Sequence, residues 1–196
     1  MNVLDEKYLA GIFDAEGSIY LDVAINERYR NKIRVYPRID IVLKVSDEYL
    51  AGLFDGDGNI MIRLQKDKSV KYGIRATPRL DIKSSSLEAL LAIQRTFGGR
   101  IEIDRNGYGR WSVTNIEDVE RIVNILLKHC IIKRRQLLIM KNEVLPIFKQ
   151  GKHRTLEGLR KLIEIHMKKL NPKSKKRHDW FKVLEEELEK RNINSK

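Results

Sequence analysis

The sequence predicts an α+β fold in which helices pack against antiparallel strands. Short segments alternate between apolar and polar residues and are separated by polar turns, which is typical of antiparallel hairpins. Longer segments carry apolar residues at helical spacing. From residue 46 onward these segments give the order α-β-β-α-β-β-α, followed by a helical tail.

A sequence repeat with an offset of 41 residues organises the N-terminal part of the chain. "YLAGIFDAEGSIY" begins at Tyr8, and "YLAGLFDGDGNIM" begins at Tyr49. The same offset relates "YPRIDI" to "TPRLDI" further along. Two diverged copies of one unit therefore follow each other, and we predict a partial copy over 1–45 and a complete unit over 46–196.

Each copy is expected to begin with a helix that leads into a hairpin. In the second copy, Ser46 or Asp47 is expected to cap a helix that runs to about Phe54, and two glycines beyond it are expected to end it. The segments 59–65 and 74–83 then alternate in polarity, which predicts two strands with one face toward a core.

Only the second copy continues beyond its hairpin. An amphipathic helix within 86–99 is expected to precede a second hairpin over 100–114. Four residues of this hairpin are expected to face the core, namely Ile101, Ile103, Trp111 and Val113. Further helical segments are predicted at 115–130, 132–148, 154–170 and 179–192.

The charge of the chain indicates a polyanionic partner. Lysine and arginine together number 39 against 27 aspartates and glutamates, which gives a formal net charge of +12. A basic excess of this size is typical of proteins that bind nucleic acid. The alternative explanation is a solvated basic surface.

Composition also predicts the class of protein and its compartment. Hydrophobic residues make up 42% of the chain, which is typical of a globular protein. No apolar run approaches the roughly 18 residues that a membrane span needs, and the N-terminus lacks a signal-peptide pattern. The single cysteine, Cys130, is expected to be a buried structural thiol. We therefore expect an intracellular protein, cytoplasmic or organellar, that is not secreted and has no membrane partner.

The repeated helix itself indicates pairing with another helix. Its glycine lowers helix propensity by about 1 kcal/mol relative to alanine. Small residues such as Ala51 and Gly52 let a second helix approach closely, so a partner of the same kind is expected. Asp57 would then lie next to its counterpart, and Mg²⁺ is the natural candidate to neutralise the two carboxylates. Asp55 is expected to be helical and structural.

The two repeated segments carry a known signature. "LAGIFDAEG" (9–17) and "LAGLFDGDG" (50–58) resemble the LAGLIDADG motif of a family of homing endonucleases. From about Asp47 to Leu188 the chain also resembles the single-motif, homodimeric members of that family. The resemblance implies a saddle of antiparallel strands over the major groove of double-stranded DNA. It further implies two units joined through their motif helices, and double-strand cleavage that leaves short 3′ overhangs.

The resemblance also implies a metal site. In this family Mg²⁺, for which Mn²⁺ is expected to substitute, is held by the last acid of each motif and the adjacent backbone carbonyl. The corresponding acids are Glu16 and Asp57, and the carbonyls belong to Ala15 and Gly56. A basic residue near the family's active site corresponds to Lys133, for which a phosphate contact is the alternative role.

Strand alternation, taken together with the resemblance, predicts which side chains meet DNA. Hairpin residues that point away from the core are expected to contact base edges and phosphates. They are Arg63, Gln65, Arg75, Thr77, Arg79, Lys83, Arg105 and Arg110. The tail loop is expected to anchor phosphates without reading sequence. Its basic residues are Lys173, Lys175, Lys176 and Arg177.

Two assemblies and two functions remain open from the sequence. Either 46–196 dimerises with two Asp57 carboxylates, or the Glu16 and Asp57 helices pair with each other. The first copy ends after its hairpin, which favours the homodimer. LAGLIDADG-like proteins also include intron maturases and DNA-binding proteins that do not cleave, so DNA or RNA binding without cleavage is the alternative function.

Overall fold

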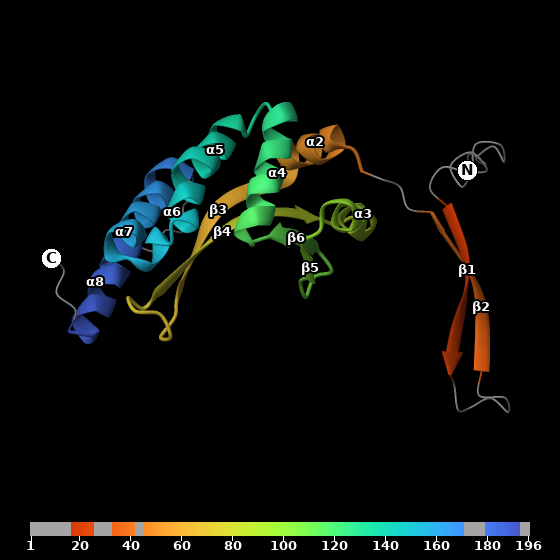
Figure 1. Cartoon of the computed structure of the whole chain (residues 1–196), viewed down its shortest axis with the longest axis horizontal. Coiled ribbons are helices and arrows are strands. Elements are labelled where there is room, and N and C mark those ends of the chain that lie inside the picture. Colours follow the sequence, from red (N-terminus) through yellow and green to blue (C-terminus); the bar gives the residue numbers. More distant parts are fainter. Residues whose placement is uncertain (1–16, 26–32, 42–44, 171–178, 193–196) are drawn as a thin grey trace. The chain divides into compact units, whose positions relative to one another are not determined.

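The computed structural model describes residues 17–25, 33–41, 45–170 and 179–192. It divides the chain into two compact units, Met1–Lys44 and Val45–Lys196 (Figure 1). In the first unit the described residues form an antiparallel hairpin of β1 (Gly17–Ile25) and β2 (Ile33–Ile41).

The hairpins of the two units have the same register. In the first unit Gly17 pairs with Ile41. In the second unit, Gly58 pairs with Ile82. Every pair between β1 and β2 recurs in the second hairpin, shifted by the offset of the sequence repeat. The repeat therefore extends from sequence to backbone pairing. The strands of the second hairpin are β3 (Gly58–Lys66) and β4 (Ile74–Ser84).

The motif helix α2 (Asp47–Asp57) begins at a side-chain cap. The hydroxyl of Ser46 accepts a hydrogen bond from the backbone N–H of Tyr49 at 3.2 Å, and two acidic residues follow in the first turn. Both features stabilise a helix N-terminus. The helix continues three residues beyond the predicted end at Phe54, and the N–H of Gly58 then bonds to the Phe54 carbonyl.

The sheet of the second unit has the strand order β3-β4-β6-β5, and all neighbouring strands are antiparallel. Helices α4 to α7 lie along one face of this sheet, and they leave the opposite face uncovered (Figure 1). This arrangement, in the predicted order of elements, confirms the α+β fold class. The short strands are β5 (Arg100–Ile103) and β6 (Gly109–Val113). The α-helices after the first hairpin are α3 (Leu87–Phe97), α4 (Ile116–His129), α5 (Arg134–Ile139), α6 (Leu145–Lys149), α7 (Leu156–Ile165) and α8 (Trp180–Lys190).

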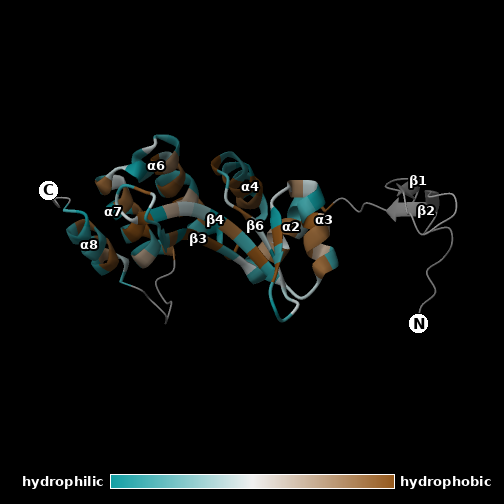
Figure 2. Ribbon diagram, turned by 90° about the horizontal axis from the view of Figure 1, so that it is seen from below, coloured by the Kyte–Doolittle hydropathy of each residue, from teal (hydrophilic) through white to brown (hydrophobic). Residues whose placement is uncertain are grey.

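The core lies between the sheet and the helices. The strands alternate between hydrophobic and hydrophilic residues along their length, as the colours in Figure 2 show. Trp111 is fully buried, and its Nε1 donates a hydrogen bond to the carbonyl of Gly98 at 2.7 Å. Val113 is buried as predicted. The prediction that Ile103 faces the core is wrong: the residue is 60% exposed, because it ends the four-residue edge strand β5.

The helix predicted over 132–148 is interrupted. A π-helical turn, η1 (Met140–Val144), separates α5 from α6. Pro146 lies at the start of α6, where its missing N–H is tolerated. Two further short turns are η2 (Lys152–Arg154) and η3 (His166–Leu170).

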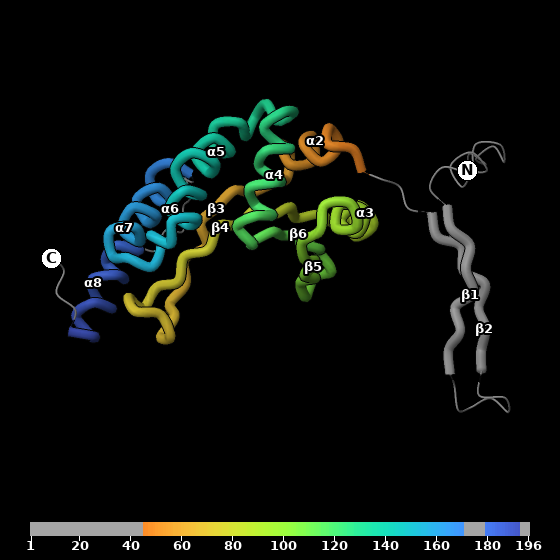
Figure 3. Tube along the Cα trace, viewed as in Figure 1, coloured from red at the N-terminus to blue at the C-terminus, as the bar shows by residue number. Residues whose placement is uncertain are grey.

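Helix α8 connects the tail to the first hairpin of the second unit. Its residues Leu184 and Leu188 are buried. Just beyond it, Arg191 donates a hydrogen bond to the carbonyl of Val70 at 2.9 Å. The tip of the β3–β4 hairpin therefore lies against the end of α8 (Figure 3). Within the described residues, no helix has both the length and the apolar character that crossing a membrane requires.

Replacing Gly58 by alanine is expected to destabilise the second unit. A Cβ atom at this position would lie 2.4 Å from the Phe54 carbonyl oxygen and 2.5 Å from the Phe54 Cγ atom. Relieving this overlap requires a shift of the backbone, which lowers the free energy of unfolding by about 1–3 kcal/mol. Urea unfolding followed by circular dichroism measures the change.

The matched control is Gly52→Ala in the same helix. A Cβ atom on Gly52 meets no atom within 4 Å. Alanine also raises helix propensity by about 1 kcal/mol, so as a single unit, at a protein concentration where it is monomeric, this variant should be as stable as the wild type or more so. A Gly58→Ala variant as stable as the wild type would contradict the close packing of β3 against the end of α2.

Candidate functional site

The end of the motif helix lies where the helix meets the sheet. Asp57 is the last residue of α2, and Gly58 begins β3 directly after it. Gly56 and Asp57 are both exposed. The structure thus places a carboxylate and the neighbouring backbone carbonyl at the surface, one residue from the first strand of the sheet.

Asp55 attaches this helix end to the connection between α4 and α5. Its carboxylate accepts backbone hydrogen bonds from Ile131 at 2.7 Å, Ile132 at 3.2 Å and Lys133 at 3.0 Å. Burial opposes ionisation of this carboxyl, but the three N–H donors outweigh burial and lower the pKa of Asp55. The residue expected to be structural is therefore the main link between two distant segments of the chain.

Lys133 joins the same two segments with hydrogen bonds whose donor lies on the α4–α5 connection and whose acceptors lie on α2. Its Nζ donates hydrogen bonds to the backbone carbonyls of Phe54 at 2.8 Å, Asp55 at 2.6 Å and Gly56 at 3.1 Å. The carbonyl end of a helix carries partial negative charge, which favours a cation there. Burial lowers the pKa of Lys133, while the negative charges of Asp55 and Asp57 act against that shift. Lys133 lies at the predicted site, and its catalytic role remains a prediction.

The residues present fit a divalent cation that is shared with other ligands. Asp57 offers a carboxylate and Gly56 a carbonyl, and Mg²⁺ prefers oxygen ligands of this kind. The three carbonyls that already face the Lys133 ammonium show that this helix end attracts positive charge. Among the described residues no group of three or more His, Cys, Asp or Glu could hold a metal. One unit would thus supply only part of a coordination shell, and a second carboxylate, phosphate oxygens and water would have to complete it.

Several predicted site residues fall outside the part of the chain that the structure describes. They are the metal-site pair Ala15 and Glu16, and the tail-loop residues Lys173, Lys175, Lys176 and Arg177. Their roles stay predictions.

The uncovered face of the sheet carries most of the other predicted DNA contacts. Register places Lys83 opposite Arg110, and both are exposed. Lys83 pairs with Asp104 at 3.1 Å and lies over the Tyr108 ring at 4.8 Å. The hydrogen bond from Lys83 lowers the pKa of the Asp104 carboxyl. The remaining exposed residues of this set are Arg63, Arg75 and Arg105, and the half-buried ones are Gln65 and Thr77.

Arg79 differs from the expectation of an exposed base reader. Strand alternation places this residue on the face of β4 that points away from the core, yet it is only 5% exposed. Its Nε is 3.1 Å from the Asp81 carboxylate, which is buried as well. The guanidinium of Arg79 is thus buried in an ion pair with Asp81, which lies two residues further along the same strand. Alternation alone identifies the face of the sheet, and it does not show whether a long side chain lies flat on it.

The motif helix and its surroundings present an unpacked apolar surface. Tyr49 and Gly52 are exposed on α2. Near the end of the helix, Ile131 is 84% and Ile132 is 74% exposed. Exposed patches of large apolar side chains mark interaction surfaces, and Ile131 and Ile132 are neighbours in the chain. The surface is consistent with the predicted pairing of motif helices.

Comparison with known proteins identifies the motif region. Residues 50–142 match the family model described as LAGLIDADG endonuclease. This match includes the second motif, 50–58, and confirms the resemblance of that motif and the residues after it. No match to a curated protein was found.

Three solved structures illustrate the likeness in fold. The homing endonuclease I-CvuI, in complex with a DNA target, has a TM-score of 0.64 and 22% identity, and the match covers 74% of this chain and 92% of that chain. The archaeal intron-encoded homing endonuclease I-Vdi141I, complexed with DNA, has a TM-score of 0.64 and 22% identity, with coverage of 76% and 97%. The LAGLIDADG meganuclease I-CpaMI, bound to uncleaved DNA, has a TM-score of 0.62 and 22% identity, with coverage of 74% and 50%.

Replacing Asp55 by asparagine is expected to destabilise the second unit in a pH-dependent way. Asparagine has one acceptor oxygen and adds a donor opposite three N–H groups, which costs about 1–3 kcal/mol. Because the pKa of Asp55 is lowered in the folded state, its contribution is present above the ordinary carboxyl pKa of 3.8 and is lost as the pH falls through the pKa of the folded state. The stability gap between wild type and Asp55→Asn should therefore be widest near neutral pH and narrow below 3.8.

Urea unfolding at pH 7 and pH 3 measures this gap. Glu185→Gln, which changes an exposed carboxylate of α8, serves as the charge-matched control and should show little effect at either pH. A gap of equal size at both pH values would contradict the ionised role of Asp55.

Proposed function

We propose that this chain is a Mg²⁺-dependent, site-specific endonuclease that cuts both strands of double-stranded DNA. The observation that carries the proposal is the position of Asp57: an exposed carboxylate at the end of the motif helix, directly before a sheet with an uncovered basic face. The family match and the DNA complexes among the similar structures support it.

Each element of the site has a separate task in this mechanism. Bound Mg²⁺ supplies Lewis acidity and a water activated for phosphodiester hydrolysis. Asp57 and the Gly56 carbonyl would hold it, and Mn²⁺ would substitute. Asp55 and Lys133 keep this helix end in place, since their hydrogen bonds fix it to the α4–α5 connection. Arg63, Lys83, Arg110 and the other basic residues of the sheet would bind the phosphates and base edges of the major groove.

A homodimer would complete the site. One unit supplies one acidic motif end, and its motif helix leaves Tyr49, Gly52 and neighbouring apolar residues exposed. The match to this chain covers 97% of the I-Vdi141I chain but 50% of the I-CpaMI chain, which is the relation expected if one unit is half of a complete enzyme. Pairing of two α2 helices would bring two Asp57 carboxylates together.

Replacing Asp57 by asparagine is expected to abolish cleavage of both DNA strands and to leave DNA affinity nearly unchanged. The substitution removes the carboxylate without removing any basic residue of the sheet. A library that contains the natural target, incubated with Mg²⁺ or Mn²⁺, measures cleavage, and a filter-binding assay measures affinity. Cleavage at the wild-type rate by this variant would refute the assigned metal ligand.

Replacing Glu16 by glutamine is expected to leave cleavage nearly intact if the second unit forms the dimer. If the Glu16 and Asp57 helices pair instead, the same change removes one of two acids and should cripple the enzyme or convert it to nicking. Gel assays on supercoiled plasmid separate nicked from linear product. Full loss of activity in Glu16→Gln, with fold and affinity unchanged, would overturn the homodimer of α2 helices and make Glu16 a metal ligand.

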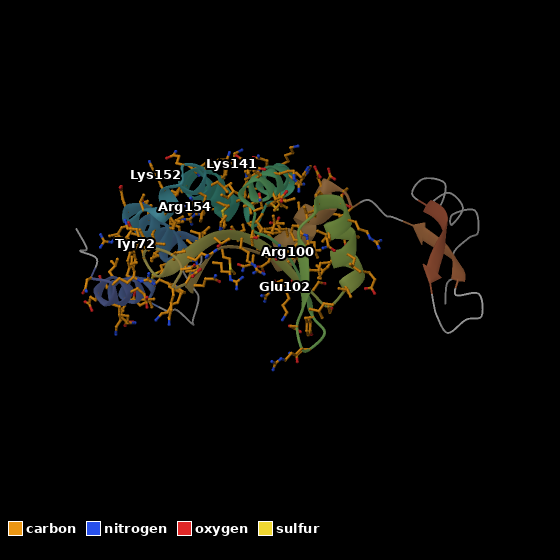
Figure 4. All side chains as sticks on the ribbon, turned by 60° about the horizontal axis from the view of Figure 1, so that its bottom comes forward. Tyr72, Arg100, Glu102, Lys141, Lys152 and Arg154 are labelled. Atoms are coloured by element: carbon orange, nitrogen blue, oxygen red, sulfur yellow. The ribbon has the colours of Figure 1, made fainter. Side chains whose placement is uncertain are left out.

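A second candidate function is nucleic-acid binding without cleavage, which includes an RNA role. The observation that favours it is a second basic surface: Lys141, Lys152 and Arg154 are exposed on the helical layer, away from the open face of the sheet (Figure 4). Under this alternative the wild-type protein would bind DNA but never nick it in Mg²⁺ or Mn²⁺.

A further inference from the structure

The uncovered face of the sheet carries carboxylates among its basic residues. Glu102 stands opposite Arg110, and Arg110 stands opposite Lys83, so the three form one row across β5, β6 and β4. Lys83 and Arg110 are predicted DNA contacts, and Glu102 shares their face. Its side chain is 63% exposed, and Figure 4 shows it on β5, away from the helical layer. An exposed carboxylate on a surface that meets a polyanion weakens non-specific binding, so its presence calls for a specific role.

Glu102 lies near the buried guanidinium of Arg79. The Arg79 Nη2 atom lies 3.8 Å from the Glu102 Oε2 atom, while the Arg79 Nε atom is fixed to Asp81. Nη2 is buried and has no hydrogen-bond partner among the described residues. A contact of 3.8 Å is an electrostatic attraction and is too long for a hydrogen bond. The guanidinium therefore attracts the Glu102 carboxylate toward this side of the sheet, and the carboxylate oxygens keep their capacity to accept hydrogen bonds.

A small hollow adjoins this carboxylate. It has a volume of about 160 Å³ and is lined by Lys83, Glu102, Ile103, Asp104, Tyr108 and Arg110. The ammonium of Lys83 is occupied by Asp104, and the backbone N–H groups of Asn106 and Tyr108 fix Asp104 at 2.9 and 3.0 Å. The β5–β6 turn is thus internally hydrogen-bonded, so it forms a defined wall beside Glu102.

We propose that Glu102 is a specificity-determining residue that accepts a hydrogen bond from the N4 amino group of a cytosine in the major groove, with Arg79 as its positioning residue. The inference rests on the proposed DNA binding. An ionised carboxylate only accepts hydrogen bonds, and in the major groove cytosine and adenine alone present amino donors. Adenine carries the N7 acceptor beside its amino group, which would repel the carboxylate, so cytosine is the better partner.

The competing explanation is that Glu102 only neutralises Arg79. An exposed partner at this distance contributes little to stability. Under that explanation, replacing Glu102 changes affinity for all sequences alike and leaves base preference unchanged. Base preference therefore separates the two explanations.

The test compares Glu102→Gln with wild type in a binding selection from a randomised DNA library, with Ca²⁺ in place of Mg²⁺. The wild type should prefer cytosine at one position of each half-site by about 5- to 150-fold, the range of a good base contact. Glutamine carries a donor and an acceptor, so the variant should lose this preference and turn toward adenine at the same position. Glu157→Gln, an equal charge change at an exposed residue of α7, should retain the wild-type preference.

A second measurement ties the preference to the amino group itself. In a duplex with 2-pyrimidinone, which lacks that group, in place of the selected cytosine, wild-type affinity should fall by a similar factor, whereas Glu102→Gln should bind both duplexes within about twofold. Thermal unfolding checks that the variant is folded, as expected for an exposed position. If the wild-type protein and Glu102→Gln select the same site with the same base frequencies, the inference is overturned and the proposed function still stands. A wild type that selects no sequence would refute the proposed function itself.

Discussion

The hydrogen bonds that Asp55 accepts from Ile131, Ile132 and Lys133 are the interaction on which the site depends. They join the end of α2 to a segment more than seventy residues away. The Lys133 ammonium returns to the same helix end and binds its terminal carbonyls. Helices α2 and α4 pack together just before this point, where the buried Cys130 thiol lies 3.5 Å from the Ala51 carbonyl. Burial raises the pKa of that thiol to about 12, so it remains protonated and inert. These contacts hold the end of α2, and with it the backbone next to Asp57, at the start of the sheet.

The glycines of the motif helix lower its intrinsic stability and leave space for another helix to pack closely against it. Helices of this length are marginal on their own, and glycines weaken them further. Here Leu50, Ala51 and Phe54 bury one side of α2, so tertiary packing stabilises the helix. The glycines lie where a Cβ atom would meet nothing in the single chain: Gly52 and Gly56 both face open space. Small residues at these positions would let a second backbone come close, which the proposed pairing of α2 helices requires.

Local patterns were enough to predict most of the elements, and long-range contacts account for what they missed. The alternation of apolar residues located β3 and β4, and Ser46 marked the start of α2, because both depend on neighbours in sequence. The motif located Asp57. By contrast, the burial of Arg79 depends on its pairing with Asp81 and on Glu102 from another strand. The exposure of Ile103 depends on β5 being an edge strand, and the role of Asp55 depends on backbone N–H groups whose position no local pattern reveals.

The repeat relates the hairpin of the first unit to the partly buried hairpin of the second unit. Its hairpin has the register of β3 and β4, so the positions of Ile19, Leu21 and Val23 in β1 correspond to Ile60, Ile62 and Leu64 in β3. In the second unit these β3 residues are buried in a core to which α4, α6 and α7 contribute, and those helices come from sequence beyond the first hairpin. The first copy is followed at once by the second motif, so it has no such helices of its own. A two-stranded hairpin alone is marginally stable in water. Within the first repeat, the sequence positions that match the buried residues of β3 therefore have no counterparts of α4, α6 and α7 to cover them.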